Sequence, residues 1–302
     1  MSAAEAASAR PSIAAVVVTY NPDATLERNL AALRAQIERV FVIDNGSSDL
    51  GAVERAARAT GCRLVRNPAN LGVAGALNQG AALAREEDFE WLATFDQDSL
   101  VPAGALDGLM DIWASHPQKD RIAILAMGHR DRVTGRPYHA ASHILEETAR
   151  WRSVRATITS GSLVRLSALE TIGPFDDRLF IDGVDHDLCL RARARGLLVI
   201  EGRAQVMDHS LGDITQHRLL WRSVSCTNHS PLRRYYITRN QLEVIRRHAL
   251  SDPTWASLAA AHLVGSSVAT VLYEPQRGAK VAAMAAGVRD FALRRFGPRA
   301  NG

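Results

Sequence analysis

Short apolar runs alternate with amphipathic segments through the first hundred residues of the chain. Four of these runs are typical of buried strands, and they cover residues 13–19, 40–43, 63–65 and 89–95. Between them, apolar residues recur at helical spacing, as Leu26, Leu30 and Leu33 do. Asp49 is placed to cap the second of these helices. Strands that alternate with helices predict βαβ units, and therefore an α/β fold with a mostly parallel sheet.

The pattern changes after about residue 150. Residues 157–166 are expected to form a strand that contains Ser160 and Gly161, and Asp182 is placed to cap a helix over residues 184–195. From about residue 230 the pattern is helical. The uncharged stretch 256–273 is long enough to be weighed as a membrane span, but Ala, Ser and Gly dominate it. We expect a packed or interfacial amphipathic helix there, with Val264 and Val268 on its apolar face.

Composition excludes several classes of protein. A hydrophobic share of 47% in 302 residues can bury a core, so a disordered chain is excluded. The three cysteines, Cys62, Cys189 and Cys226, form no CxxC pair, which fits a reducing compartment rather than a zinc knuckle or a disulfide framework. Residues 1–12 lack the features of a secretory signal, and we expect a disordered leader on a cytoplasmic protein.

The formal net charge of +4 is concentrated at the end of the chain. Residues 274–302 contain six basic and two acidic residues, which is a difference of +4. Such a tail favours contact with an anionic surface, although a solvated helix face explains it equally well. The tyrosines and arginines of residues 233–240 could mimic a nucleic-acid stripe. No motif for binding RNA or DNA accompanies them, so no nucleic-acid partner is expected.

Polar clusters follow the strands of the first hundred residues. They are Thr19-Tyr20-Asn21, Asp44-Asn45, residues 67–78 and Asp96-Gln97-Asp98. Because ligands of open parallel sheets bind outside the carboxyl ends of the strands, these clusters predict a single cleft. Asp96 and Asp98 could bind one hard cation such as Mg²⁺ or Mn²⁺, or form an acidic turn. Asp44 could accept a hydrogen bond from a base or ribose, or cap a turn. The small residues of the loop 70–75 suit close approach to phosphate.

Three aspartates, Asp182, Asp185 and Asp187, cluster further along the chain. Like charges raise the pKa of at least one of them, and a carboxylate poised in that way can act as a general base toward a hydroxyl. The alternative is structural, with Asp182 as a helix cap and Asp187 paired with Arg191. This alternative is favoured for Asp182 and Asp187, and it leaves the role of Asp185 open.

Two later positions could carry further chemistry. His209 could complete the ligand shell of a divalent metal, or be a hydrogen-bonded loop histidine. Arg239 could hold a departing phosphate, and helical spacing places Tyr235 over it.

In this order, these residues resemble an inverting family 2 glycosyltransferase with a GT-A fold over residues 13–297. Within that family the chain is most similar to bacterial rhamnosyltransferases that use dTDP-L-rhamnose, of the rhamnolipid and O-antigen type. The resemblance is carried by Phe95-Asp96-Gln97-Asp98-Ser99, by Phe180-Ile181-Asp182-Gly183-Val184-Asp185, and by Asn228-His229-Ser230-Pro231-Leu232-Arg233-Arg234-Tyr235-Tyr236 with Arg239-Asn240. One position departs from it, since many members have Glu-Asp where this chain has Val184-Asp185.

The resemblance implies a division of the chain and a set of residue roles. It implies a Rossmann-like GT-A catalytic domain over residues 13–225, with a nucleotide half 13–100 and an acceptor half 101–225, and a C-terminal helical region over 226–302. Asp185 would be the catalytic base. The nucleotide would be bound by Thr19, Tyr20, Asn21, Asp44, Asn45, Asn70, Gly72, Asn78, Asp96 and Gln97. Asp96, Asp98 and His209 would bind the metal, and Arg239, Tyr235, Tyr236, Ser160 and Gly161 would bind phosphate or acceptor.

The function implied is metal-assisted transfer of L-rhamnose from dTDP-L-rhamnose to a hydroxyl of a glycolipid or lipid-linked saccharide. Mg²⁺ or Mn²⁺ would be the cofactor. Three alternatives stay open: a glycosyltransferase with a UDP or GDP donor, a sugar nucleotidyltransferase, and a non-catalytic binding relative. We expect a cytoplasmic protein with peripheral membrane contact through residues 256–299, and the sequence does not indicate an oligomeric state.

Overall fold

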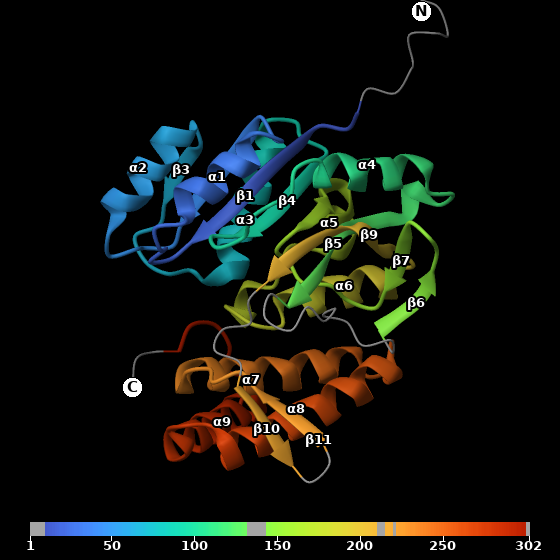
Figure 1. Ribbon diagram of the computed structural model, residues 1–302. Helices are drawn as coiled ribbons and strands as arrows, with labels where there is room; N and C mark the ends of the chain where they lie inside the picture. Colours follow the sequence, from blue (N-terminus) through green and yellow to red (C-terminus); the bar gives the residue numbers. More distant parts are fainter. Residues whose placement is uncertain (1–9, 132–142, 210–214, 220–221, 300–302) are drawn as a thin grey trace, which may run out of the picture.

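The computed structural model describes residues 10–131, 143–209, 215–219 and 222–299 (Figure 1). Within these residues, nine strands form one sheet in the order β3-β2-β1-β4-β8-β5-β9-β7-β6. The strands are β1 Ile13–Thr19, β2 Arg39–Asp44, β3 Arg63–Arg66, β4 Trp91–Asp96, β5 Ile122–Asp131, β6 Ile144–Glu147, β7 Trp151–Val154, β8 Ser162–Arg165 and β9 Leu198–His209. The predicted α/β fold class is therefore confirmed.

The first half of this sheet is parallel, as the alternating pattern predicts. Strand β1 pairs in parallel with β2 and β4, and β2 pairs in parallel with β3. The second half is mixed, since β8 runs antiparallel to β4 and β5, and β7 runs antiparallel to β6 and β9. The connection between β6 and β7 is too short for a crossover helix, so these two strands can pair only in the antiparallel sense.

The predicted strand over residues 157–166 is too long. Strand β8 begins only at Ser162, because Gly161 has a φ of +80° and turns the chain just before it. Ser160 and Gly161 therefore lie in the turn that precedes β8, close to the end of β4.

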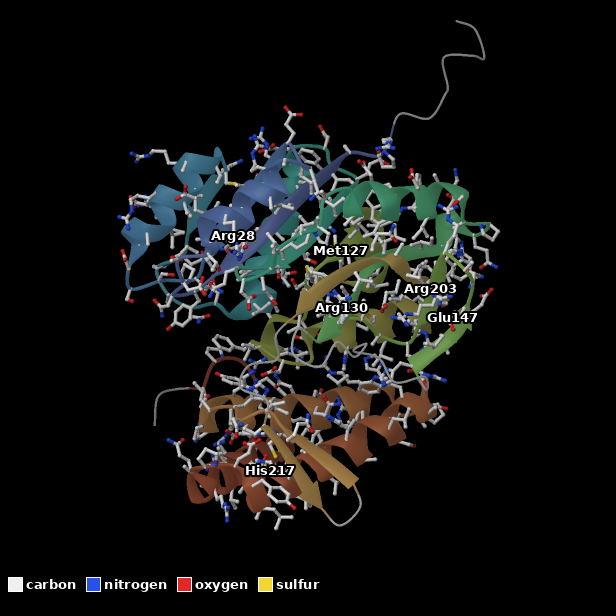
Figure 2. All side chains as sticks on the ribbon, in the orientation of Figure 1. Arg28, Met127, Arg130, Glu147, Arg203 and His217 are labelled. Atoms are coloured by element: carbon white, nitrogen blue, oxygen red, sulfur yellow. The ribbon has the colours of Figure 1, made fainter. Side chains whose placement is uncertain are left out.

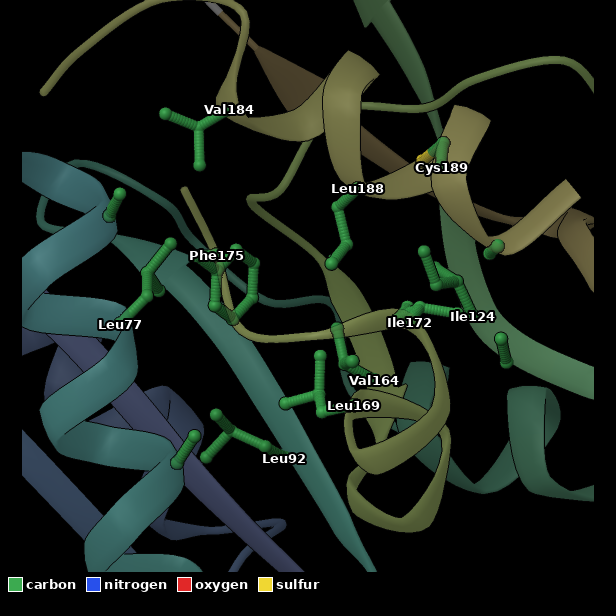
Figure 3. Close-up of a cluster of buried hydrophobic side chains, with 14 of the residues drawn as sticks. Leu77, Leu92, Ile124, Val164, Leu169, Ile172, Phe175, Val184, Leu188 and Cys189 are labelled. Atoms are coloured by element: carbon green, nitrogen blue, oxygen red, sulfur yellow. The ribbon is translucent and has the colours of Figure 1, made fainter. Parts of the chain in front are cut away.

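Helices cover both faces of the sheet in the α/β part of the molecule (Figure 1). They are α1 Leu26–Arg34, α2 Leu50–Thr60, α3 Gly72–Glu86, α4 Ala105–Ser115, α5 Leu166–Ile172 and α6 Val184–Ala194. On one face, Leu77, Leu169 and Leu188 of these helices belong to one buried cluster with Leu92 (Figure 3). On the other face, α1 and α4 contribute to a second buried cluster that includes Trp91. Strands buried on both faces must be apolar throughout, which explains the continuous apolar runs of the sequence.

The start of α2 confirms one predicted cap. The side chain of Asp49 accepts a hydrogen bond from the backbone N–H of Ala52 at 3.1 Å. Such a cap satisfies one of the N–H groups that the first turn of a helix leaves unpaired.

The C-terminal part forms a helical layer below the sheet, as predicted (Figure 1). Its helices are α7 Pro231–His248, α8 Pro253–Tyr273 and α9 Arg277–Ala292, and they are preceded by a hairpin of β10 Thr215–Leu219 and β11 Arg222–Cys226. The hairpin lies with these helices rather than with the large sheet, since the Cys226 thiol donates to the carbonyl of Ala269 on α8. Most of the hairpin thus precedes the boundary at 225/226 in sequence but belongs spatially to the helical region.

Buried ion pairs join this layer to the α/β part. Arg247 of α7 reaches Asp176 at 2.6 Å and Asp187 at 3.2 Å, and Asp252 pairs with Arg155 at 2.5 Å. Asp187 also pairs with Arg191 at 2.8 Å, which confirms the structural alternative for this residue. Pairs of this kind fix the relative placement of packed elements, because a charge separated from its partner would stay buried and uncompensated.

The first prediction concerns close packing between α3 and β1. A Cβ added at Gly80 would lie 2.5 Å from a methyl carbon of Val16, whereas one added at Gly265, within α8, would meet nothing within 4 Å. We expect Gly80→Ala to destabilise the protein by about 1–3 kcal/mol through overpacking. Gly265→Ala should instead stabilise it by about 0.5–1 kcal/mol through helix propensity. Urea unfolding of both variants measures the two effects, and equal shifts of the same sign would contradict the packing argument.

Candidate functional site

A cleft of about 620 Å³ lies between the α/β part and the C-terminal helices. Figure 2 shows side chains of both parts facing one another across this boundary. The polar residues that line the cleft are Tyr20, Asp96, Gln97, Asp98, Thr159, Ser160, Asp182, Asp185, His186, His229, Arg233, Gln241, His262 and Ser266. The cleft therefore brings together six of the predicted site residues: Tyr20, Asp96, Gln97, Asp98, Ser160 and Asp185.

Asp96 and Asp98 lie where β4 ends, at the carboxyl edge of the parallel half of the sheet. Ser160 supports this turn, because its hydroxyl accepts from the backbone N–H of Asp96 at 3.2 Å and lies 2.6 Å from the hydroxyl of Ser99. Burial, followed by the nearby charges of Asp98 and Asp185, raises the pKa of Asp96 to about 6, against the opposing charge of Arg233. Carboxylates thus crowd this end of the cleft.

The loop before α6 has an unusual backbone that α7 holds in place. Phe180 and Asp182 have φ values of +66° and +63°, which are costly for residues with side chains. The buried amide of Asn240 donates to the carbonyls of Leu179, Ile181 and Asp182 at 2.7, 2.7 and 3.0 Å. Asp185 lies in the first turn of α6, directly after this loop. Helix α7 therefore determines where Asp182 and Asp185 lie.

The prediction that Asp182 caps α6 is wrong. The N-cap position is occupied by Gly183, whose φ is +84°, and it has no side-chain cap. Asp182 turns instead toward α7 and forms an ion pair with Arg233 at 3.1 Å. Burial raises the pKa of Asp182, and the charge and hydrogen bonds of Arg233 oppose that rise.

Arg239 does not lie in the cleft, which corrects the prediction that it holds a departing phosphate. It is 1% exposed, its guanidinium stacks near the rings of Tyr235, Tyr236 and Phe296, and it donates to the carbonyls of Leu179 and Gly297. These contacts use the guanidinium to join α7 to the loop before α6 and to the end of the chain.

Tyr235 and Tyr236, also predicted to bind phosphate or acceptor, are buried in the same joint. The hydroxyl of Tyr235 donates to Asp290 of α9 at 2.8 Å, and that of Tyr236 accepts from the backbone N–H of Arg299 at 2.7 Å. Their role in this arrangement is to attach α9 and the following segment to α7.

Asp44 lies next to the cleft but is engaged in a turn. Its carboxylate accepts from the hydroxyl of Thr19 at 3.0 Å and from the backbone N–H groups of Gly46 and Ser47 at 3.2 and 3.0 Å. Asn45 is likewise engaged, since it donates to the carbonyl of Gly72 at 3.0 Å. This geometry matches the turn-cap alternative for Asp44, and it makes Thr19 and Asn45 supports of the same edge.

Four further predicted nucleotide residues shape neighbouring loops. Asn21 accepts from the backbone N–H of Ser48 at 2.8 Å, and Asn70 from that of Gly72 at 2.8 Å. Gly72 has a φ of +79°, and a Cβ there would lie 2.5 Å from the carbonyl oxygen of Phe180, so this glycine permits contact with the loop before α6. Both ends of the Asn78 amide bond the backbone of Phe175, outside the cleft.

The residues predicted to bind a metal are only partly placed. Asp96 and Asp98 both line the cleft, whereas the side chain of His209, at the end of β9, lies outside the described residues. Within the described residues, no group of three or more His, Cys, Asp or Glu forms a preassembled metal site. The Asp96–Asp98 pair still fits a hard cation, because oxygen ligands suit Mg²⁺ or Mn²⁺ and a cation would offset the cost of ionising Asp96, whose pKa is raised by burial and by the charges of Asp98 and Asp185. Gly161 lies beside this turn, and a Cβ added there would lie 3.1 Å from Met207 and 3.3 Å from His129.

Sequence reasoning missed Arg233, His229 and His262 as residues of the cleft. The signal was present in the helical spacing of Arg233, Ile237 and Gln241, which line the cleft from one face of α7. Burial and the charge of Arg233 lower the pKa of His229 to about 4, and burial also lowers the pKa of His262. Both imidazoles are therefore neutral at pH 7.

The second prediction concerns the pH dependence of stability in the presence of a chelator. The pKa of Asp96 is about 6 in the folded chain and about 4 when unfolded. Between these values the folded state binds the proton more tightly, so the free energy of unfolding falls as pH rises. The Asp96→Asn variant has no carboxylate to ionise here, so it avoids this fall in the free energy of unfolding. Its stability relative to the wild type should therefore increase from about pH 4 to about pH 7. Urea unfolding at several pH values measures it, and a constant difference would contradict the raised pKa.

Comparison with known proteins assigns the chain to a family. The family model described as "Glycosyl transferase family 2" matches residues 14–173. A curated relative from Shigella flexneri, named dTDP-rhamnosyl transferase RfbF, is 29% identical over 250 residues, which is 78% of this chain and 80% of the relative. A Mycobacterium tuberculosis relative, named N-acetylglucosaminyl-diphospho-decaprenol L-rhamnosyltransferase, is 30% identical over 229 residues, 64% of this chain and 75% of the relative.

Solved structures agree on the fold. The mannosyltransferase PcManGT from Pyrobaculum calidifontis, in complex with GDP-Man and Mn²⁺, aligns with a TM-score of 0.61 at 19% identity, over 95% of this chain and 89% of that one. GalNAc-T7 with UDP, GalNAc and Mn²⁺ aligns with a TM-score of 0.58 at 13% identity, over 95% of this chain and 57% of that one. With its mixed sheet, its cleft at the carboxyl edge and the match over more than half its length, the chain belongs to glycosyl transferase family 2 and is a glycosyltransferase of the GT-A fold.

Proposed function

We propose that this glycosyltransferase transfers L-rhamnose, with inversion, from dTDP-L-rhamnose to a hydroxyl of a lipid-linked saccharide. The observation that carries the proposal is the cleft, in which Asp185 from α6 shares one space with Asp96 and Asp98 from β4. The names of the two curated relatives support the choice of rhamnose, and the M. tuberculosis name supports a lipid-linked acceptor.

In the proposed reaction, Asp185 is the general base. As the acceptor oxygen bonds to the anomeric carbon, its proton passes to the Asp185 carboxylate and the bond from that carbon to the diphosphate oxygen breaks. The nucleoside diphosphate leaves with the electron pair from the opposite face, so the configuration inverts. Val184, the departure from the wider family's motif, is 4% exposed and belongs to the apolar core, where it anchors the helix that carries the base.

Asp96 and Asp98 are the residues that would hold the divalent cation. Such a cation supplies positive charge that offsets the charge developing on the leaving diphosphate. Mn²⁺ in both solved relatives supports this assignment.

The nucleoside would lie at the edge formed by β1 and β4, where Tyr20 is half-exposed and its backbone N–H donates to Gln97 at 2.8 Å. Thr19, Asp44 and Asn45 support this edge from behind. A UDP or GDP donor is the alternative within the same mechanism.

The third prediction tests the base. Asp185→Asn should lower kcat by at least about a hundredfold, because a positioned base contributes roughly 10²–10⁴-fold. The affinity for dTDP should change much less. Transfer is measured with dTDP-, UDP- and GDP-linked sugars and Mn²⁺, and nucleotide binding by calorimetry. Asp111→Asn, on the exposed side of α4, is the control. Near-normal turnover of Asp185→Asn would show that Asp185 is not the base. A preference for UDP- or GDP-linked sugars would show that the donor is not dTDP-L-rhamnose.

We also propose that the protein acts at the cytoplasmic face of a membrane and contacts it through α8. Of the described helices, α8 has the length and hydropathy to cross a membrane, and 28% of its apolar window is buried. Val264, Val268 and Leu272 are 64%, 48% and 45% exposed. The basic residues after α8 contribute less to membrane binding than the sequence suggests, because Lys280 is buried and paired with Glu274 at 2.8 Å.

The fourth prediction tests this contact. The wild type should float with vesicles that contain anionic lipid, and a Val264→Asp, Val268→Asp double variant should float much less, because two exposed apolar side chains become charged. Neutral vesicles report how much of the binding depends on lipid charge. Equal flotation of both proteins, or none of either, would exclude α8 as the membrane contact.

A further inference from the structure

The charges that line the cleft are strongly unequal. Four carboxylates face it, from Asp96, Asp98, Asp182 and Asp185, and among the described lining residues one side chain is an arginine or lysine, Arg233. Two of the lining histidines do not add positive charge, since the lowered pKa values of His229 and His262 keep them neutral at pH 7. A nucleoside diphosphate that enters this space therefore needs the positive charge of Arg233 in addition to any cation.

Arg233 is held in a way that permits exchange. Its guanidinium contacts Asp182 at 3.1–3.4 Å, its side chain is 47% exposed, and it lies in the first turn of α7. The arginine end of this pair faces solvent, where ion pairs are weak, so the guanidinium can move to another acidic partner, whereas the Asp182 side chain is only 19% exposed. Arg233 and Asp96 line the same cleft, so the guanidinium faces the space where the diphosphate is proposed to lie.

Asp182 is the fixed member of the pair. Its carbonyl accepts from Asn240, and its backbone is held at a φ of +63°. When the two separate, the guanidinium with its long, flexible stem is the group that moves. Asp182 can then hold Arg233 toward the cleft before the donor binds.

We propose that Arg233 exchanges Asp182 for the diphosphate of the bound donor and stabilises the leaving nucleoside diphosphate during transfer. This inference rests on the proposed function and adds a contact to it. It reassigns to Arg233 the phosphate contact first expected of Arg239. In the balanced step, the electron pair of the broken bond from the anomeric carbon stays on the diphosphate oxygen. The guanidinium donates hydrogen bonds to the diphosphate there, while the acceptor proton goes to Asp185.

The test compares binding of dTDP with that of thymidine, which lacks the phosphates, by calorimetry in the presence of Mn²⁺. Arg233→Gln should weaken dTDP binding by about tenfold to a hundredfold, the loss expected for a hydrogen bond to a charged group, and leave thymidine binding unchanged. Arg233→Lys should recover part of the loss, because lysine keeps the charge without the planar fork. The kcat of Arg233→Gln should also fall.

Asp182→Asn should change dTDP affinity in the opposite direction from Arg233→Gln. Asparagine tolerates a positive φ and cannot form the ion pair, so the loop is retained while Arg233 no longer has to give up this ion pair when the ligand binds. We expect this variant to bind dTDP several times more tightly than the wild type. A purely structural role for the pair would instead make both variants bind more weakly.

Arg246→Gln is the matched control. Arg246 lies on the same helix, its side chain is 46% exposed, and it pairs with one acidic residue, Glu243, at 2.9 Å outside the cleft. Its removal should leave dTDP binding unchanged. Unchanged dTDP affinity in Arg233→Gln, or weaker dTDP binding in Asp182→Asn, would overturn the inference. If the wild type binds none of dTDP, UDP and GDP, the proposed function fails as well; if UDP or GDP binds, the same variants are measured with that nucleotide.

Discussion

The amide of Asn240 donates to three carbonyls of the loop before α6, and the rest of the site depends on this contact. Two residues of that loop, Phe180 and Asp182, have a positive φ that the loop would not keep unaided. These hydrogen bonds also satisfy carbonyl groups that would otherwise be buried without partners. Because Asp185 follows the loop directly, a residue of the C-terminal helices positions the proposed base of the α/β part.

The cleft is accordingly a property of both parts of the chain together. The α/β part contributes its carboxylates, α7 and α8 contribute Arg233 and His262, and the segment just before α7 contributes His229. Burial and the charges of Asp98 and Asp185 together raise the pKa of Asp96, because a carboxylate is costly to ionise where it is desolvated and lies beside other carboxylates. The arrangement suits a ligand that brings or binds positive charge beside its own phosphates, and this is how the proposed donor, cation and guanidinium fit one site.

Local interactions account for the predictions that the structure confirms. The buried strand at residues 13–19, the α/β alternation of the first hundred residues and the Asp49 cap each depend on residues close in sequence. The side-chain roles that were predicted wrongly concern groups whose actual partners lie far along the chain. The local sequence predicts that Asp182 caps a helix, but in the folded chain it forms an ion pair with Arg233, 51 residues later. The local sequence suggests that Arg239 binds phosphate, but in the folded chain backbone carbonyls and aromatic rings surround its guanidinium.

The sequence by itself determined the fold class, the family and three of the acidic residues of the cleft, Asp96, Asp98 and Asp185, because apolar periodicity, strand-end positions and short motifs are local and survive without coordinates. Only the tertiary structure decided which polar side chains face the cleft and which are consumed in holding it together. Helix α7 shows the reason, because two of its residues, Arg233 and Arg239, have the same side chain. The orientation in which the helix packs directs Arg233 into the cleft and buries Arg239.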